Sequence, residues 1–196
     1  MWSFPQSLEG RYVRLEPLTL SHLPGFQAQF DSEVYRHMSH RVRGPEDLRA
    51  HLEALLSEPG RVNWAVFLGG ELAGRISVIA PDPQNRKLEI GTLIFKPFWG
   101  SPANKEAKYL LLRHAFEVLL AERVQFKVDP LNLRSQRALE SLGAVREGVL
   151  RRNRLLSDGR FRDDVVYSIL REEWPRVKAR LEEKLYGAFP GDTGGA

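Results

Sequence analysis

The residues best placed to do chemistry lie in a short segment that also has the pattern of a complete helix. It runs from Asp129 to Ala144, and its first turn holds the amide of Asn132 and the hydroxyl of Ser135. A side-chain amide can bind a ligand, and a hydroxyl can donate a proton. Both can equally be structural, because Asn132 stands where an N-cap residue accepts a backbone N–H one turn into the helix.

Apolar residues and a glycine define the rest of this helix, which we expect over 132–142. Ala138, Leu139 and Leu142 form an apolar stripe at helical spacing. Gly143 follows where a left-handed backbone ends many helices, a conformation that is easiest for a residue without a Cβ. The pattern predicts a short, well-capped helix with one buried side.

The same segment resembles the "Asn-x-x-Ser…Leu-Gly-aromatic" block of the GNAT superfamily of acyl-CoA-dependent N-acetyltransferases. Within it, the segment is most similar to the RimJ/RimL-type ribosomal-protein N-acetyltransferases. The resemblance covers roughly residues 10 to 172 and implies acetyl-CoA as co-substrate. It gives Asn132 a hydrogen bond to the pantetheine arm of the cofactor. It places Ser135 at the sulfur, where its hydroxyl would protonate the leaving thiolate.

A second segment, from Leu88 to Gly100, resembles the central strand of that superfamily and the turn after it. In the family this strand splays away from its neighbour, and the freed backbone N–H groups bind the pantetheine arm and the thioester oxygen. Donors held in this way stabilise the oxyanion of a tetrahedral intermediate. The resemblance puts the cofactor contacts at Leu93, Ile94 and Phe95, whereas periodicity alone indicates an ordinary core strand.

The turn after this strand is expected to hold the cofactor pyrophosphate, but it departs from the family pattern. That pattern is Arg/Gln-x-x-Gly-x-Gly/Ala at a helix start, where small residues let backbone N–H groups approach phosphate. This chain has Trp99, Pro102 and Asn104 at three of the patterned positions, and proline lacks an N–H. The departures predict an altered cofactor geometry or a partly disabled site, and equally fit a plain helix start. The candidate contacts here are Trp99, Gly100, Ser101, Ala103, Asn104 and Lys105, with Lys108 as a further source of positive charge.

Glu89 is the candidate general base. The attacking amine must be neutral, and a carboxylate can take its proton directly or through water. The matching strand position in RimJ/RimL-type proteins is often a glutamate. The structural alternative is a strand carboxylate paired with an arginine. Glu147, Asp163 and Asp164 are reserve candidates for the base or for anchoring the substrate, although Asp163 and Asp164 also fit a solvated turn.

The histidines give no indication of a metal site. His37 and His40 are three residues apart, but they lie in an expected loop with no carboxylate or cysteine nearby, and His22, His51 and His114 show no ligand spacing either. The chain also lacks the P-loop, Rossmann and nucleophile-elbow motifs. We therefore expect acetyl-CoA chemistry without a metal.

The composition is that of a soluble globular protein. Net charge is +4, which favours anionic partners in general, but no nucleic-acid-binding motif supports nucleic acid as the primary ligand. No apolar run approaches the length of a membrane span, no signal peptide is evident, and there is no cysteine. These features predict a cytoplasmic protein without a membrane partner.

The remaining sequence predicts the elements that must position these residues. We expect strands over 11–15, 62–68, 71–79, 87–95 and 124–128, a hairpin of 145–155 with 160–170, and helices over 18–31, 44–58, 104–121, 132–142 and 172–186. This order predicts an α/β fold: a single GNAT-like domain over 1–186, with a mixed, mostly antiparallel sheet flanked by helices and with a C-terminal helix. Residues 187–196 are expected to be a flexible tail.

Together these features predict an acetyl-CoA-dependent N-acetyltransferase in which a primary amine attacks the thioester directly in a ternary complex. The resemblance implies the N-terminal α-amine of a protein, of ribosomal origin, as acceptor. It places the choice of acceptor in residues 21–58 and 151–162. Two alternatives stay open: a small amine, polyamine or aminoglycoside as acceptor, and a non-catalytic acyl-CoA-binding or interaction module. A homodimer is a further expectation from the resemblance, since an exposed strand edge could support one.

Overall fold

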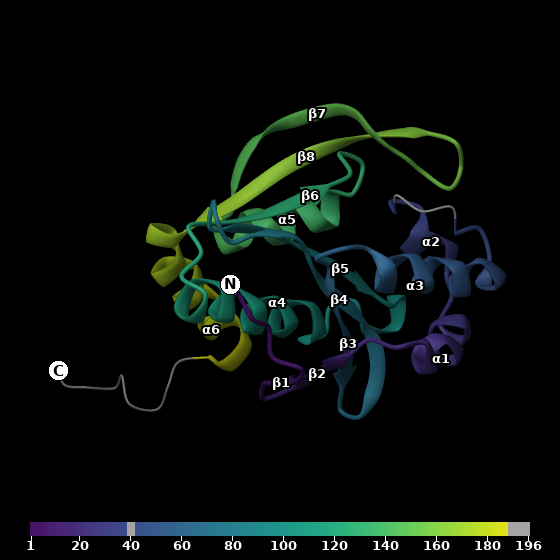
Figure 1. Ribbon diagram of the computed structural model, residues 1–196, viewed down its shortest axis with the longest axis horizontal. Helices are drawn as coiled ribbons and strands as arrows, with labels where there is room; N and C mark the ends of the chain where they lie inside the picture. Colours follow the sequence, from purple (N-terminus) through teal and green to yellow (C-terminus); the bar gives the residue numbers. More distant parts are fainter. Residues whose placement is uncertain (39–41, 188–196) are drawn as a thin grey trace.

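The computed structural model describes residues 1–38 and 42–187, so His40 and the expected tail beyond Gly187 lie outside the described residues. An eight-stranded sheet runs through the molecule in the order β1-β2-β3-β4-β5-β6-β8-β7 (Figure 1). Neighbouring strands are antiparallel except for β5 and β6, which are parallel. The strands are β1 (Leu8–Glu9), β2 (Val13–Pro17), β3 (Val62–Leu68), β4 (Glu71–Asp82), β5 (Lys87–Ile94), β6 (Arg123–Val128), β7 (Val145–Leu155) and β8 (Phe161–Leu170).

Helices cover both faces of this sheet (Figure 1). They are α1 (Leu23–Ala28), α2 (Ser32–Tyr35), α3 (Leu48–Ser57), α4 (Ala103–Arg113), α5 (Leu133–Leu142) and α6 (Trp174–Tyr186). Short turns of other helix types join them: η1 (Leu20–His22), η2 (Pro45–Asp47), η3 (Lys96–Phe98), η4 (His114–Val118, a π-helical turn) and η5 (Arg171–Glu173).

The alternation of side chains along β4 divides the interior into two cores. Ile76 and Val78 point to one face and pack with apolar residues of α4 and α6. The opposite face forms a second core with α1 and α3, which includes Leu93 and Phe95 from the β5 region. Because successive strand residues point to opposite faces, Arg75 and Ser77 lie on this second face.

The parting of β5 from β6 is the feature that creates a site. The two strands pair only where Lys87–Glu89 meets Arg123–Gln125. Beyond Glu89, β5 continues to pair with β4 as far as Ile94, while β6 continues beside β8 as far as Val128. The strands therefore share a short parallel stem and then separate, as the sequence resemblance implied.

The predicted fold is confirmed, and its differences from the structure concern short elements. β1 and α2 were not expected: β1 has two residues, and α2 has four, begun by the Asp31 carboxylate accepting the amide of Glu33. Neither is long enough to show a hydrophobic period. The first long strand is β2 rather than 11–15, and the helix expected over 104–121 ends as an α-helix at Arg113 and continues as the π turn η4.

Of the helices among residues 1–38 and 42–187, none is both long and apolar enough to cross a membrane.

Gly74 is the residue on which the pairing of β4 with β5 depends most directly. Its φ is +152°, and a Cβ built there would lie 2.1 Å from the carbonyl oxygen of Leu93. We expect Gly74→Ala to lower the free energy of unfolding by roughly 2–4 kcal/mol, because it adds backbone strain and a clash with main chain. Urea unfolding measures this loss.

The control is Gly148→Ala in β7, where a Cβ would meet nothing within 4 Å. This variant should stay within about 0.5 kcal/mol of the wild type. Equal stability of the two variants would show that β4 and β5 are not as closely paired as described.

Candidate active site

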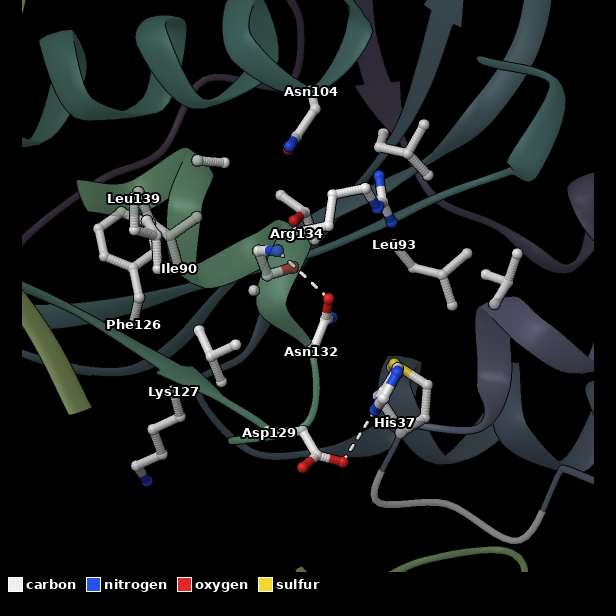
Figure 2. Close-up of a pocket in the computed structure, with 18 of the residues that line it drawn as sticks. His37, Ile90, Leu93, Asn104, Phe126, Lys127, Asp129, Asn132, Arg134 and Leu139 are labelled. Carbon is white, nitrogen blue, oxygen red and sulfur yellow. Dashed lines mark hydrogen bonds and ion pairs between the residues drawn. The ribbon is translucent and has the colours of Figure 1, made fainter. Parts of the chain in front are cut away.

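A cavity of about 460 Å³ fills the space that opens between β5 and β6. Its walls come from these two strands, the start of α5, the first two turns of α4, and the chain around α2. Figure 2 shows Asn104 of α4 and Asn132 and Arg134 at the start of α5 around this space, with His37 across it. The cavity is therefore formed by segments distant in sequence that meet at the parted strands.

The hydrogen-bond register between β4 and β5 decides which amides of β5 face the cavity. The amide of Phe95 donates to the carbonyl of Ala73 at 2.8 Å, and Leu93 lies opposite Arg75 in the same register. Backbone groups of alternate residues point to opposite sides of a strand, so the amide of Leu93 also points toward β4. The amides of Thr92 and Ile94 then point toward the gap where β6 has left.

This register changes which of the expected residues, Leu93, Ile94 and Phe95, can offer an amide to the thioester oxygen. Phe95 does not line the cavity: its amide is bonded to Ala73 and its side chain is buried in the second core. Leu93 lines the cavity, but its amide points toward β4. Ile94 keeps its expected place, and Thr92 was missed although the odd–even alternation of the strand could have indicated it.

The start of α5 confirms the predicted caps. The side-chain oxygen of Asn132 accepts the amide of Ser135 at 3.2 Å, and Gly143 ends the helix with φ of +94°. Asn132 and Ser135 both line the cavity. Because the Asn132 oxygen is used by the cap, its side-chain N–H₂ is the part available to a ligand.

The turn at the start of α4 is ordered by Ser101. Its hydroxyl donates to the carbonyl of Phe98 at 2.6 Å and accepts the amide of Ala103, the first residue of α4, at 3.2 Å. Asn104 and Lys105 then occupy the next two positions, where a helix offers amides that have no intrahelical acceptor. Pro102 precedes the helix, so its missing N–H removes none of these donors.

The side chain of Asn104 has an unused acceptor. Its Oδ1 is buried and has no hydrogen-bond partner among the described residues, and the residue lines the cavity. A buried carbonyl oxygen without a donor is unfavourable. A ligand that carries amide N–H groups would satisfy it.

A cation from α5, Arg134, packs against the turn that precedes α4. The guanidinium carbon of Arg134 lies 3.7 Å from the centre of the Trp99 ring, within cation–π range. The indole N–H of Trp99 in turn donates to the carbonyl of Ile94 at 2.9 Å. Trp99 thus holds a cation where the family pattern has Arg or Gln, a role that the sequence did not reveal because Arg134 is remote from the turn.

The two lysines of α4 differ in environment. Lys108 is 7% exposed and lines the cavity, and burial, with repulsion from Arg134, lowers its pKa to about 8. Lys105 is exposed and close enough to Lys184 to repel it. Of the predicted contacts in this turn, only Trp99, Asn104 and Lys108 line the cavity; Gly100, Ser101, Ala103 and Lys105 do not.

Glu89 lies at the stem of the parted strands and is 7% exposed. Its carboxylate accepts a hydrogen bond from Gln125 at 3.0 Å and lies 3.3 Å from the ammonium of Lys127 and 3.9 Å from the guanidinium of Arg154. Glu89 is therefore paired with an arginine, as its structural alternative requires. It also lines the cavity, as a general base must.

His37 and Asp129 form a pair that the sequence did not indicate. The Nδ1 of His37 lies 2.8 Å from Oδ2 of Asp129 (Figure 2). This corrects the expectation that His37 has no carboxylate near it: Asp129 is remote in sequence and is brought close by the end of β6. Arg160 binds the same carboxylate oxygen at 2.5 Å. Burial by itself would raise the pKa of Asp129, but the hydrogen bonds from Arg160 and His37 outweigh it and hold the pKa below its usual value.

The reserve acids lie outside the cavity. Glu147 is paired with Arg123 and accepts from Ser168. Asp163 accepts the amide of Arg152 at 2.7 Å. Asp164 is fully buried against Arg154 and Arg162, so the interpretation of this position as a solvated turn is wrong.

The lining of the cavity is strongly cationic. Eight of its residues are arginine or lysine and three are aspartate or glutamate. The cations are Arg36, Arg61, Arg75, Lys108, Lys127, Arg134, Arg154 and Arg162. Such a lining suits an anionic ligand. Among the described residues, no group of three His, Cys, Asp or Glu side chains is arranged to hold a metal ion.

Comparison with known proteins agrees with this geometry. The family described as "Acetyltransferase (GNAT) domain" matches residues 13–145. A crystal structure from T. thermophilus, described as a "putative acetyltransferase", has 72% sequence identity and a TM-score of 0.92, and covers 95% of this chain and 100% of that one. RimJ of Mycobacterium smegmatis in complex with CoA-disulfide has the same fold, with 20% identity, a TM-score of 0.74, and coverage of 88% of each chain.

A curated relative is also similar. "Putative ribosomal N-acetyltransferase YdaF" of Bacillus subtilis (strain 168) is 38% identical over 117 residues, which are 60% of this chain. The match spans 63% of the length of that relative.

The hydrogen bonds of Asp129 lead to a prediction about stability and pH. A carboxyl group whose pKa is lowered by folding stabilises the folded state above its unfolded pKa of about 3.9, and this contribution is lost as pH falls through the folded pKa. Asp129→Asn should therefore lower the free energy of unfolding by roughly 1–3 kcal/mol near neutral pH. The difference from the wild type should shrink in acid.

Urea unfolding of both proteins across this pH range measures the effect. Glu183→Gln, on the exposed side of α6, is the matched control and should change little at any pH. A difference between Asp129→Asn and the wild type that stays constant down to about pH 3 would contradict the assignment.

Proposed function

Since this chain belongs to the GNAT family of acetyltransferases, we propose that it transfers the acetyl group of acetyl-CoA to the N-terminal α-amine of a protein. The observation that carries the proposal is the cavity between β5 and β6, which the amides of Thr92 and Ile94 face. The start of α5 lies beside it with Asn132 and Ser135. A cavity with backbone donors on one side and side-chain donors on the other suits a thioester.

The residues around the cavity fit acetyl-CoA chemically. The unused acceptor of Asn104 and the side-chain N–H₂ of Asn132 match the amide groups of a pantetheine arm. The free amides at the start of α4, together with Arg134, match a pyrophosphate. These contacts support cofactor binding even though the turn departs from the family pattern. RimJ of Mycobacterium smegmatis, which has the same fold, is described in complex with CoA-disulfide, and this supports a CoA compound as the ligand.

The mechanism follows from what these groups can do. The amides of Thr92 and Ile94 would stabilise the negative charge that develops on the thioester oxygen during attack by the amine. Glu89 would accept the proton of the attacking amine, directly or through water. Ser135 would donate a proton to the departing sulfur. A thiol has a pKa of about 8.5, so its thiolate already leaves readily, and we expect the contribution of Ser135 to be modest.

The acceptor enters from the side of α2 and the β7–β8 hairpin. His37 follows α2, and Arg154 and Arg162 come from the hairpin, so these segments line the part of the cavity beyond Glu89. YdaF, by its name, supports a ribosomal protein as the source of the amine. A small amine is the second candidate acceptor. The cationic lining disfavours a polyamine or an aminoglycoside, which are themselves cations.

Two further parts of the proposal concern the protein's surroundings. A cytoplasmic location would give access to ribosomal proteins and acetyl-CoA. A homodimer could form along β7, which is the last strand of the sheet and has exposed apolar residues such as Val149 and Leu150.

The direct test is release of CoA thiol from acetyl-CoA in the presence of peptides with free N-termini, with mass spectrometry of the products. We expect a mass increase of one acetyl group on the N-terminal amine. Thermal unfolding with acetyl-CoA completes the test, since a ligand at about 100 times its Kd stabilises a protein by about 2.7 kcal/mol. Stabilisation without turnover of any amine would favour the non-catalytic acyl-CoA-binding module instead.

The proposed base leads to a prediction about kcat/KM. Glu89→Gln should lower it by about 100-fold or more for a peptide acceptor near neutral pH, because proton transfer by a positioned group contributes this much. The deficit should shrink above about pH 9, where an α-amine is already neutral. Steady-state kinetics across pH measure both effects.

Two variants complete this experiment. Glu147→Gln, which lies outside the cavity, should stay within about twofold of the wild type. His37→Gln tests the other candidate proton acceptor, whose Nδ1 faces Asp129. If His37→Gln loses more activity than Glu89→Gln and shows the rescue at high pH, His37 is the base and Glu89 is not.

A further inference from the structure

Arg75 is a buried cation with no counter-ion among the residues that the structure describes. It lies in β4, is 2% exposed, and lines the cavity. No hydrogen bond or ion pair joins its guanidinium to any residue within 1–38 or 42–187, and its Nε is buried without a partner. Burial of an unpaired charge is costly, so the Arg75 guanidinium at this position suits an anion that the described residues do not supply.

Arg61, the arginine beside Arg75, has hydrogen-bond and ion-pair partners of its own. Arg61 donates to the side chain of Asn63 at 2.9 Å and to Glu58 at 3.0 Å. It repels Arg75, and burial together with this repulsion lowers the pKa of Arg75 to about 9. Arg75 therefore still carries its positive charge at neutral pH.

A second unsatisfied group lies near Arg75. The hydroxyl of Tyr35 is buried and has no hydrogen-bond partner among the described residues, and it interacts electrostatically with Arg75. Burial raises the pKa of Tyr35 to about 12, so the hydroxyl remains a donor. A guanidinium and a phenol hydroxyl are both donors that a carboxylate can accept.

The position of Arg75 separates it from the cofactor phosphates. Ile76, the next residue, points to the core beneath α4, so Arg75 points to the other face of the sheet, where α3 packs. On that face it lies directly opposite Leu93 on the neighbouring strand. The cofactor contacts proposed above lie instead at the starts of α4 and α5.

The same face brings Arg75 close to the reacting groups. Glu89 shares the face, four residues along β5 from Leu93, which is about 13 Å at the rise of a strand. The amides proposed to hold the thioester, those of Thr92 and Ile94, flank Leu93. An anion bound by Arg75 would therefore belong to the acceptor and lie only a few bonds from its amine.

We propose that Arg75 binds a carboxylate of the acceptor, so that the enzyme selects primary amines with an acidic group close to the amine. The selection rests on the proposed acetyl transfer. The carboxylate can come from an acidic side chain next to a protein N-terminus or from the α-carboxylate of a free amino acid, and the chemistry of recognition is the same.

The test compares matched acceptors in the wild type, Arg75→Met and Arg75→Lys. The peptide pair is Ser-Glu and Ser-Gln at the start of an otherwise identical neutral, amidated peptide, and the amino-acid pair is alanine and alaninamide. A lost charged hydrogen bond is worth roughly 1.5–3 kcal/mol, which is about 10- to 100-fold. We expect the wild type to prefer one acidic acceptor by this factor in kcat/KM, and the pair that shows it identifies the source of the carboxylate.

The variants decide whether Arg75 causes the preference. Arg75→Met should abolish it and keep turnover of the neutral acceptor, while Arg75→Lys should keep part of it. Arg61→Met removes a neighbouring guanidinium that has its own partners, and should keep the full preference. Equal selectivity of Arg75→Met and the wild type, or a wild type without preference for either acidic acceptor, would overturn the proposal.

A second readout does not need catalysis. Calorimetry with glutarate, and with its uncharged diamide as control, should show glutarate binding to the wild type and none to Arg75→Met.

Arg75→Met should also raise the melting temperature of the free protein, because it replaces an unpaired buried charge by an apolar chain of similar length. If no amine is acetylated but glutarate binding depends on Arg75, the acetyl-transfer proposal fails and the anion site stands. If acetylation occurs and glutarate binds both proteins equally, the acetyl-transfer proposal stands and the anion site at Arg75 fails.

Discussion

The structure depends on the hydrogen bonds that β5 does not make. After Glu89 this strand loses β6 as a neighbour and keeps only β4, so its backbone groups alternate between paired and unpaired. Unpaired strand groups inside a protein are unfavourable unless a ligand or water satisfies them. The parting of the strands is stable because β4 stays paired with β5, with no room for a Cβ at Gly74 beside the Leu93 carbonyl, and because β8 stays paired with β6.

The arginines around the cavity fall into two groups: those paired with a carboxylate and those without one. Arg154 and Arg162 share the buried Asp164 within the β7–β8 hairpin, and Arg160 connects this hairpin to the rim of the cavity through Asp129. Arg134 lies on an aromatic ring, and Arg75 has no partner among residues 1–38 and 42–187. In our account, paired cations build the walls, while the cations without carboxylate partners bind the anionic parts of the two substrates.

The sequence was sufficient for most of the fold because the long elements have clear periods and ends. The caps of α5 and the hairpin of β7 with β8 are local patterns, and both are present. Asn132 and Ser135 were recognisable for the same reason. The short elements β1 and α2 have too few residues to show a pattern.

The parts of the site that the sequence missed are contacts between distant segments. Arg134 meets Trp99, and His37 meets Asp129, across separations that no local spacing encodes. Arg75 was missed because it stands in a strand whose pattern otherwise indicates core. Its lack of a partner can be recognised only when all its neighbours are known.

In the proposed mechanism the amides of Thr92 and Ile94 face the cavity and bind the thioester arm of acetyl-CoA. Residue-specific amide hydrogen exchange by NMR, with and without saturating acetyl-CoA, tests it most directly. We expect acetyl-CoA to slow exchange at Thr92 and Ile94 by about tenfold or more, while Leu93, already paired with β4, changes little. Unchanged exchange at Thr92 and Ile94 in a protein that demonstrably binds acetyl-CoA would contradict it.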